Sequence, residues 1–300
     1  MTPLEARPAT AVPGVMPVRV LVDEAMRCLR ANLRRLFLPF AAVFMVLGGL
    51  TVVLQAGMME GMVQGDLASG CGAMAATYAV IAVMMFVYAP MTVAALDAVA
   101  GRPVSIGRAW RFALRPRVFF TVVGTGVMVL GSYMCCILPI LYVGPLLSLT
   151  LPVMVEEGRF GADAIGRGAR LVGSNPFADF PRNPLVRLLV FGVVTMAISF
   201  LGTLVVQMPF EILRQFLFLR QAAAEEAIAT MTSPGSLALQ ATGAVLGSLV
   251  TTVVGLYGVF GVALLFHDTR NRREGADLEA AAAELAALRP PLPGRGEALA

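Results

Sequence analysis

The chain has 300 residues, of which 58% are hydrophobic and 14% are charged, whereas a soluble domain averages roughly 45–50% and about 25%. This composition excludes a secreted disulfide scaffold, a disordered tail and a typical cytosolic enzyme, and it predicts an integral membrane protein. The formal net charge is +4, but in a membrane protein the location of charges matters more than their sum, so nucleic acid is not an expected partner.

Six stretches are long and apolar enough to cross a hydrocarbon core of about 30 Å, which takes about 20 helical residues. They are 36–55, 74–96, 118–136, 137–155, 188–208 and 240–266. We therefore expect an all-α fold: a loose segment over 1–17, a six-helix membrane domain with short cytoplasmic amphipathic helices over 18–280, and a cytoplasmic tail over 281–300. The first apolar run begins only near Leu36, so it is expected to act as a signal anchor and not as a cleaved signal peptide.

The placement of arginine predicts the orientation of these spans. All 23 basic residues are arginine, and 21 of them lie in four segments: the first 35 residues, 97–117, 156–187 and the C-terminal tail. The alternate segments hold only Arg214 and Arg220. Because basic residues favour the cytoplasmic side, the sequence predicts a multi-pass plasma (inner) membrane protein with both termini in the cytoplasm.

A short arginine motif recurs on the predicted cytoplasmic side. Residues 106–112 have the sequence IGRAWRF, residues 165–171 have the sequence IGRGARL, and residues 24–30 form a looser third copy. Each copy precedes an apolar span, which predicts three units of one amphipathic helix followed by one transmembrane hairpin. Chance similarity between arginine- and alanine-rich loops stays the alternative.

These arginine helices are expected to lie in the membrane interface, with Trp110, Phe112, Leu114 or Leu171 at acyl depth and the arginines on anionic headgroups. We also expect the charged cluster at 268–277 to dock against 156–157 and 167–170. The alternative is that the arginines only set the topology and contact headgroups generically. The candidate contacts for lipid headgroups or for a protein partner are Arg108, Arg111, Arg167, Arg170, Arg270, Arg272 and Arg273.

Residues suited to catalysis or metal binding are sparse. His267 is the single histidine and is expected merely to close the last span, and the four cysteines show no CxxC spacing, so the sequence predicts no catalytic, cofactor or metal site. Cys71, Cys135 and Cys136 are expected near the external face, where either a bridge from Cys71 or simple buried thiols is compatible with the sequence.

Two further patterns concern helix packing. Gly243, Gly247 and Gly255 recur at helical spacing, which favours close helix contacts either within the bundle or at a homodimer face. The predicted external segment 209–236 has an apolar face and is expected to form a separate interfacial or re-entrant helix that ends at Pro234.

Two blocks of the chain carry a family resemblance. The first contains Leu151-Pro152-Val153, Glu156, Ala164, Arg167 and 170–173, and the second runs from 257 to 265 and then from 268 to 279. Together they resemble the membrane domain associated with glycerophosphoryl diester phosphodiesterases, although Gly168-Ala169, His267 and Ala276 depart from the family pattern. The resemblance implies a six-helix membrane module without the separate barrel that carries the family's enzymatic residues, so it implies no activity here.

The sequence therefore predicts a non-enzymatic integral membrane protein, either a scaffold or a module that contacts anionic lipids and a protein partner. The competing class is a permease or transporter for a lipid-like or uncharged small molecule. An ion-coupled carrier is not expected, because the predicted spans hold no charged residue away from their ends. A substrate-sized polar cavity would favour transport, whereas a filled core would favour a scaffold.

Overall fold

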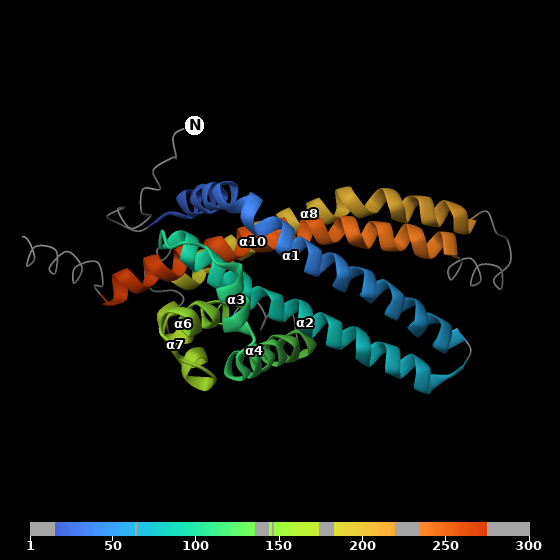
Figure 1. Ribbon diagram of the computed structural model, residues 1–300, viewed down its shortest axis with the longest axis horizontal. Coiled ribbons are helices and arrows are strands. Elements are labelled where there is room, and N and C mark those ends of the chain that lie inside the picture. Colours follow the sequence, from blue (N-terminus) through green and yellow to red (C-terminus); the bar gives the residue numbers. More distant parts are fainter. Residues whose placement is uncertain are drawn as a thin grey trace, which may run out of the picture.

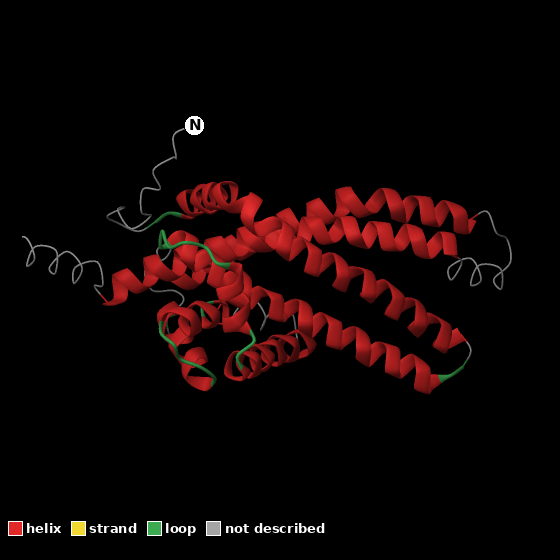
Figure 2. Ribbon diagram, viewed as in Figure 1, coloured by secondary structure: helices red, strands yellow, loops and turns green. Residues whose placement is uncertain are grey.

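The computed structural model describes residues 16–63, 65–135, 144–145, 147–173, 183–219 and 234–274. Within these ranges the regular structure is helical, which confirms the all-α prediction (Figure 2). The long helices α1 (Val18–Val63), α2 (Leu67–Val99), α8 (Pro184–Leu219) and α10 (Pro234–Glu274) run along the length of the molecule (Figure 1). The shorter helices gather at one end: α3 (Ile106–Ala113), α4 (Pro116–Cys135), α6 (Thr150–Glu156) and α7 (Ala162–Val172).

The four long helices are those that can cross a membrane by length and composition. The qualifying segments are Val18–Met59, Ala68–Val99, Pro184–Leu213 and Gly235–Arg272. They support a membrane location and contain the predicted spans 36–55, 74–96, 188–208 and 240–266. Helix α4 begins and ends close to the predicted third span, 118–136, whereas the predicted fourth, 137–155, falls partly outside the described residues, so the count of six stays a prediction.

Helix α1 joins the first arginine segment to the first span without interruption, over 46 residues. Its first turns are amphipathic, because Leu21 and Leu29 are buried while Arg27 and Arg30 are exposed. Pro39 lies within the helix, where a missing N–H and a crowded carbonyl cause a bend. Figure 1 shows the dark blue first turns at an angle to the rest of α1.

The turn between α1 and α2 is much shorter than the predicted external segment 56–73, most of which is helical. Asp66 caps α2, since its carboxylate accepts hydrogen bonds of 3.2 Å from the first backbone N–H groups. Gly65 has a φ of 71°, a left-handed conformation that glycine adopts readily. A Cβ at Gly61 would overlap the backbone of Gly70, so the two helices meet closely at the turn.

Residues 209–219 continue α8, so the expectation of a separate interfacial or re-entrant helix over 209–236 is wrong for this first part. Pro209 lies inside α8 because neighbouring helices can compensate for a proline kink in an apolar helix. The segment 220–233 lies outside the described residues. Pro234 begins α10, a position where the missing N–H is not needed.

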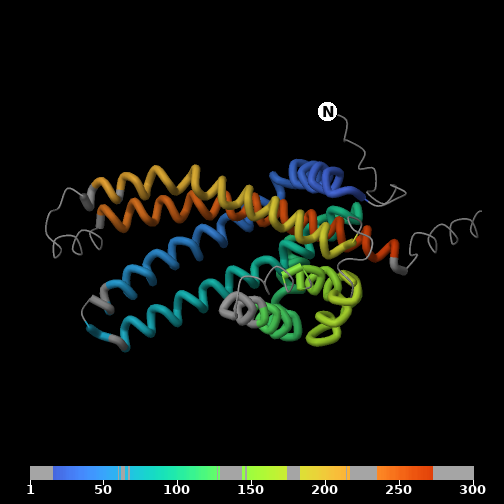
Figure 3. The backbone as a smooth tube through the Cα atoms, turned by 180° about the vertical axis from the view of Figure 1, so that it is seen from behind, coloured from blue at the N-terminus to red at the C-terminus, as the bar shows by residue number. Residues whose placement is uncertain are grey.

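Helix α10 is the central element, because it packs against α1, α2 and α8. Figure 3 shows α8 beside α10 along most of their length, while the hairpin of α1 and α2 diverges from them towards its turn. The glycines of α10 lie in these contacts. A Cβ at Gly243 would touch Phe210 at 3.5 Å, one at Gly247 would overlap Gln207, and one at Gly255 would meet Tyr88 at 3.3 Å. The glycine face therefore packs within the chain.

The apolar faces of α3 and α7 cover the helical core of the protein itself. Trp110 on α3 packs against Phe40 of α1, with ring centroids 6.3 Å apart, and Leu171 on α7 is only 1% exposed. Of the side chains expected at acyl depth, Leu114 alone is largely exposed, at 67%. These faces therefore pack on the bundle, which buries the same apolar surface, and their depth in the membrane stays a prediction.

Candidate functional site

The two copies of the arginine motif form similar local structures. Both lie on helices, α3 and α7, and the second arginine of each copy bends back onto its own helix. The Nε of Arg111 donates to the carbonyl of Gly107 at 3.3 Å, and the Nε of Arg170 donates to that of Gly166 at 3.2 Å. Because Gly107 and Gly166 are also equivalent in the motif, the sequence repeat corresponds to a structural repeat.

The first arginine of each copy pairs with a carboxylate at the end of the preceding apolar helix. Arg108 pairs with Asp97, 11 residues earlier. Arg167 pairs with Glu157, 10 residues earlier, with its Nε 2.9 Å from Oε2 and 3.1 Å from Oε1. Equivalent ion pairs therefore accompany both copies of the arginine motif, and the predicted hairpin after each copy stays a prediction.

Asp97 is the centre of the first ion-pair network. Its side chain is 0% exposed, and its Oδ1 pairs with Arg108 and with the Nε of Arg102 at 3.2 Å. Arg102 also binds Glu156 at the end of α6. Because a buried carboxylate is unfavourable without cationic partners, this network fixes the position of α3 and of the preceding loop relative to α2 and α6.

Two further ion-pair networks centre on Glu157 and on Asp268. Glu157 binds Arg159 as well as Arg167. Asp268 on α10 binds Arg187 of α8, with Nη1 and Oδ2 2.6 Å apart, and Arg272 of its own helix at 3.0 Å. Arg187 is 2% exposed, and its Nε and Nη2 are buried without a hydrogen-bond partner in the described part.

A cavity of about 420 Å³ lies beside the Asp97 network, between α2, α3 and α6. We call it the basic pocket, and it is lined by Val93, Arg102, Arg108, Arg111, Phe112, Arg115, Val155 and Glu156. The guanidinium groups of four arginines and the carboxylate of Glu156 therefore line the same cavity. Even with Asp97 included the arginines are in excess, so the pocket is positively charged.

Arg111 and Arg115 provide this excess charge. Among the described residues neither makes an ion pair with a carboxylate. Arg115 lies over the ring of Phe112, with its guanidinium carbon 5.4 Å from the ring centroid, a cation–π contact that holds the side chain in place. A guanidinium group has five N–H donors, so both residues retain donors for an anion that enters the pocket.

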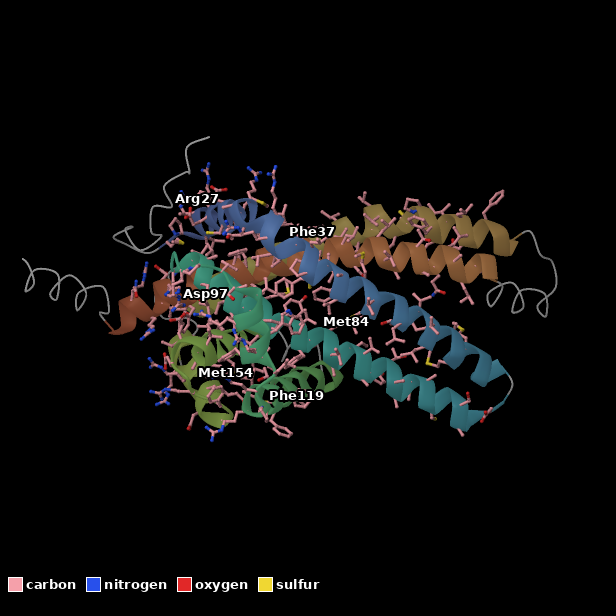
Figure 4. The ribbon with its side chains drawn as sticks, in the orientation of Figure 1. Arg27, Phe37, Met84, Asp97, Phe119 and Met154 are labelled. Carbon is pink, nitrogen blue, oxygen red and sulfur yellow. The ribbon has the colours of Figure 1, made fainter. Side chains whose placement is uncertain are left out.

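Figure 4 shows where such groups lie in the molecule. Blue nitrogen atoms gather at the end that holds Arg27 and Asp97, whereas the far parts of the four long helices carry mostly carbon. The basic pocket therefore lies at the end of the molecule where α1 starts and α10 finishes (Figure 1).

The structure separates the predicted arginine contacts into groups. Arg108 and Arg111 line the basic pocket, whereas Arg167 and Arg170 lie on α7, where Arg167 is engaged by Glu157. Arg270 and Arg272 lie near the end of α10, and the side chain of Arg273 is outside the described set. The described ion pairs of Asp268 are with Arg187 and Arg272, and the proposed docking of 268–277 on 156–157 and 167–170 stays a prediction, although α10 does contact α6 and α7.

Arg102 and Arg115 are pocket residues that the sequence did not single out. Arg102 lies in a loop, where no periodicity marks it. Arg115, however, follows Arg108 and Arg111 at positions i, i+3 and i+7, a spacing that places side chains on one helical face. The spacing of the three arginines is therefore the feature of the sequence that could have identified Arg115 as a pocket residue.

Three expectations about reactive residues can be compared with the structure. His267 does not end the last helix, since α10 continues to Glu274, and its Nε2 is buried without a hydrogen-bond partner in the described part. Cys71 is an exposed free thiol, so it forms no bridge here, and the side chains of Cys135 and Cys136 are not described. No group of three His, Cys, Asp or Glu suited to a metal ion occurs among the residues that the structure covers.

A second, larger cavity of about 630 Å³ lies between α2, α6, α8 and α10. It differs from the basic pocket because its described lining residues carry no charge.

Comparison of the chain with protein-family models, with curated proteins and with solved structures finds no match. The geometry of the two cavities therefore carries the functional argument.

Proposed function

We propose that this chain is a non-enzymatic, multi-pass protein of a bacterial plasma membrane that binds the headgroup of an anionic phospholipid in the basic pocket. The observation that carries the proposal is the set of four arginines around one cavity, two of them without a carboxylate partner in the described part. Anionic headgroups are held at basic pockets between membrane helices through their phosphates. The planar guanidinium fork matches phosphate oxygens in a bidentate geometry.

The proposed orientation places the basic pocket at the cytoplasmic surface. Of the 23 arginines, 21 lie in the segments assigned to the cytoplasm, and α1 begins at the same end of the molecule at which α10 finishes (Figure 1). An even number of spans, six in this proposal, agrees with that arrangement. A headgroup of the inner leaflet then lies at the depth of the pocket, and a protein partner or a second copy stays open as an additional ligand.

The resemblance to the membrane domain associated with glycerophosphoryl diester phosphodiesterases supports the same proposal. It implies a membrane module whose role is separate from the phosphodiesterase barrel of other members. Because no position of this chain matches the catalytic residues of that barrel, we propose membrane binding and not phosphodiester hydrolysis.

The test is lipid binding by purified protein in phosphatidylcholine nanodiscs that contain increasing fractions of phosphatidylglycerol. Replacing Arg111 and Arg115 with Gln removes the two arginines without a described carboxylate partner. Since each basic residue near an anionic surface contributes about 1 kcal/mol, the double variant should bind phosphatidylglycerol about thirtyfold more weakly. Native mass spectrometry of retained lipid gives the readout.

The matched control is Arg170→Gln on α7. Arg170 occupies the position equivalent to Arg111 and makes the same backbone hydrogen bond, but it does not line the basic pocket. This variant should retain phosphatidylglycerol at the wild-type level. The counterpart of this control is the single variant Arg111→Gln. If the two single variants weaken binding equally, the arginines act as a generic charged surface and the pocket proposal is wrong.

A second candidate function is transport of a lipid-like molecule, which the cavity of about 630 Å³ favours by its volume, although its lining is apolar and not the polar lining that we expect of a transport cavity. Its volume lies in the range of about 300–1,000 Å³ that is usual for small-molecule sites. A flux assay in vesicles with a fluorescent phospholipid in one leaflet separates the candidates, because a binding module leaves the leaflet distribution unchanged.

A further inference from the structure

The larger cavity lies at the depth of the membrane spans and has an apolar interior. Its lining comes from four helices and includes Tyr88 and Thr92 of α2, Leu151 of α6, Phe191 of α8 and Val254 and Val259 of α10. Tyr88 and Thr92 belong to Ala68–Val99, one of the segments long enough to span a membrane, and Val254 and Val259 belong to Gly235–Arg272.

Four of the hydroxyl groups that line the cavity already donate to backbone carbonyls. Thr92 donates to the carbonyl of Tyr88 at 2.8 Å, Thr195 to that of Phe191 at 2.9 Å, and Thr251 to that of Gly247 at 3.0 Å. Ser148 donates to Pro145 at 2.7 Å. Among the described lining residues, this leaves the hydroxyls of Tyr88 and Ser199 as donors, so an occupant with several polar groups would lose hydration that the lining replaces only in part. A strongly polar occupant is disfavoured on this ground.

The cavity opens sideways, towards the lipid. Helix α8 is the most exposed of the four long helices, because only 6% of its most apolar stretch is buried inside the protein. Val193 and Met196 line the cavity and are nevertheless 46% and 66% exposed. The mouth of the cavity thus lies on a face that acyl chains surround in a bilayer, so the molecules with direct access to it are hydrocarbon chains.

We infer that the cavity between α2, α6, α8 and α10 binds a hydrocarbon chain, such as one acyl chain of a membrane lipid, that enters past α8. Burial of a chain against the apolar lining is favoured by dispersion contacts that an empty space lacks. Glycine at position 192 leaves the space open, since Gly192 lines the cavity and a Cβ there would meet nothing within 4 Å. The inference is independent of the basic pocket, because the two cavities share no lining residue.

The test uses phosphatidylcholine with a photoactivatable diazirine in one acyl chain, reconstituted with the full-length protein in nanodiscs. Phosphatidylcholine has no net charge, so failure of the anionic-headgroup proposal does not alter the expected result. After illumination, peptide mass spectrometry should find label on Thr92, Val254 or Val259, which are buried behind α8. Label restricted to exposed positions such as Val46 and Val205 would overturn the inference.

Cavity-filling variants make the result specific. Gly192→Leu and, separately, Ser199→Leu place a larger side chain in the cavity, and a Cβ at Gly192 meets nothing within 4 Å. Both variants should lose label at the buried positions while keeping it on exposed ones. The matched control is Gly49→Leu on α1, where a Cβ also meets nothing within 4 Å, and there the buried label should persist. Unchanged buried label in both filled variants contradicts the inference even if one variant folds poorly.

Discussion

Helices α3 and α7 carry the same arginine motif, yet only α3 borders the basic pocket. In both helices the first arginine pairs with a carboxylate of the preceding apolar helix, and the second donates to its own backbone. The difference lies in the neighbours, because Arg102, Arg115 and Glu156 complete a cavity around α3. A repeated motif therefore specifies a local structure, whereas a binding site depends on the segments that pack around it.

The largest expected effect is on stability, and it comes from replacing the first arginine of each motif copy, Arg108 or Arg167. Arg108→Gln leaves the fully buried Asp97 with one cationic partner, which should lower the free energy of unfolding by about 2–3 kcal/mol. Arg167→Gln leaves Glu157 with Arg159 as its cationic partner, and because the side chain of Glu157 is 9% exposed and reaches water, the loss should be smaller, about 1–2 kcal/mol. Denaturant titration in detergent micelles measures both values.

Asp97→Asn is the informative control for that comparison. It removes the buried charge, and the two arginines that remain are 41% and 51% exposed, so water can solvate them. The loss should therefore be smaller than for Arg108→Gln. A larger loss would show that the arginines depend on Asp97 more than Asp97 depends on them.

A smaller effect concerns the charge of the basic pocket. Glu156→Gln removes the carboxylate that lines the pocket beside Arg102. If the pocket binds an anionic headgroup, phosphatidylglycerol should bind more tightly by about 1 kcal/mol, or roughly fivefold. Glu157→Gln on the α7 side is the matched control and should leave lipid retention in nanodiscs unchanged, and tighter binding in the control alone would contradict the site.

The smallest effect concerns the starts of the two helices. Ser105 caps α3 by accepting a hydrogen bond of 3.4 Å from the N–H of Arg108. Because this bond is long, Ser105→Ala should lower the free energy of unfolding by about 0.5 kcal/mol, the low end of the range for a lost helix cap. Gly161 precedes α7 with a φ of 63° and a ψ of −140°, a conformation that glycine adopts readily and alanine does not, so Gly161→Ala should cost about 1 kcal/mol through backbone strain. The apparent melting temperature in detergent should therefore fall less for Ser105→Ala than for Gly161→Ala.

Much of the helical architecture could be predicted, because apolar length and arginine placement are local properties of the sequence. The ends of the helices could not. The sequence predicts that a separate interfacial or re-entrant helix starts at Pro209, yet Pro209 lies inside α8, since the hydrophobic surroundings make continued backbone hydrogen bonding more favourable than an unpaired chain. Pro39 in α1 shows the same effect.

The candidate site was predictable only in part. The motif identified Arg108 and Arg111, but the burial of Asp97 depends on contacts between segments that no periodicity reveals. Trp110 illustrates the same limit, because its amphipathic helix predicts a ring at acyl depth but does not reveal that the ring packs on Phe40. An amphipathic helix has the same pattern whether lipid or protein covers its apolar face.

The short turn between α1 and α2 has a consequence for membrane insertion. In the proposed orientation this turn must cross the bilayer, and it carries the carboxylate of Asp66. That carboxylate already accepts two backbone hydrogen bonds at the start of α2, which offsets part of the cost of removing it from water. With so few residues between them, α1 and α2 cannot enter the membrane as independent segments, so the hairpin is the unit of insertion.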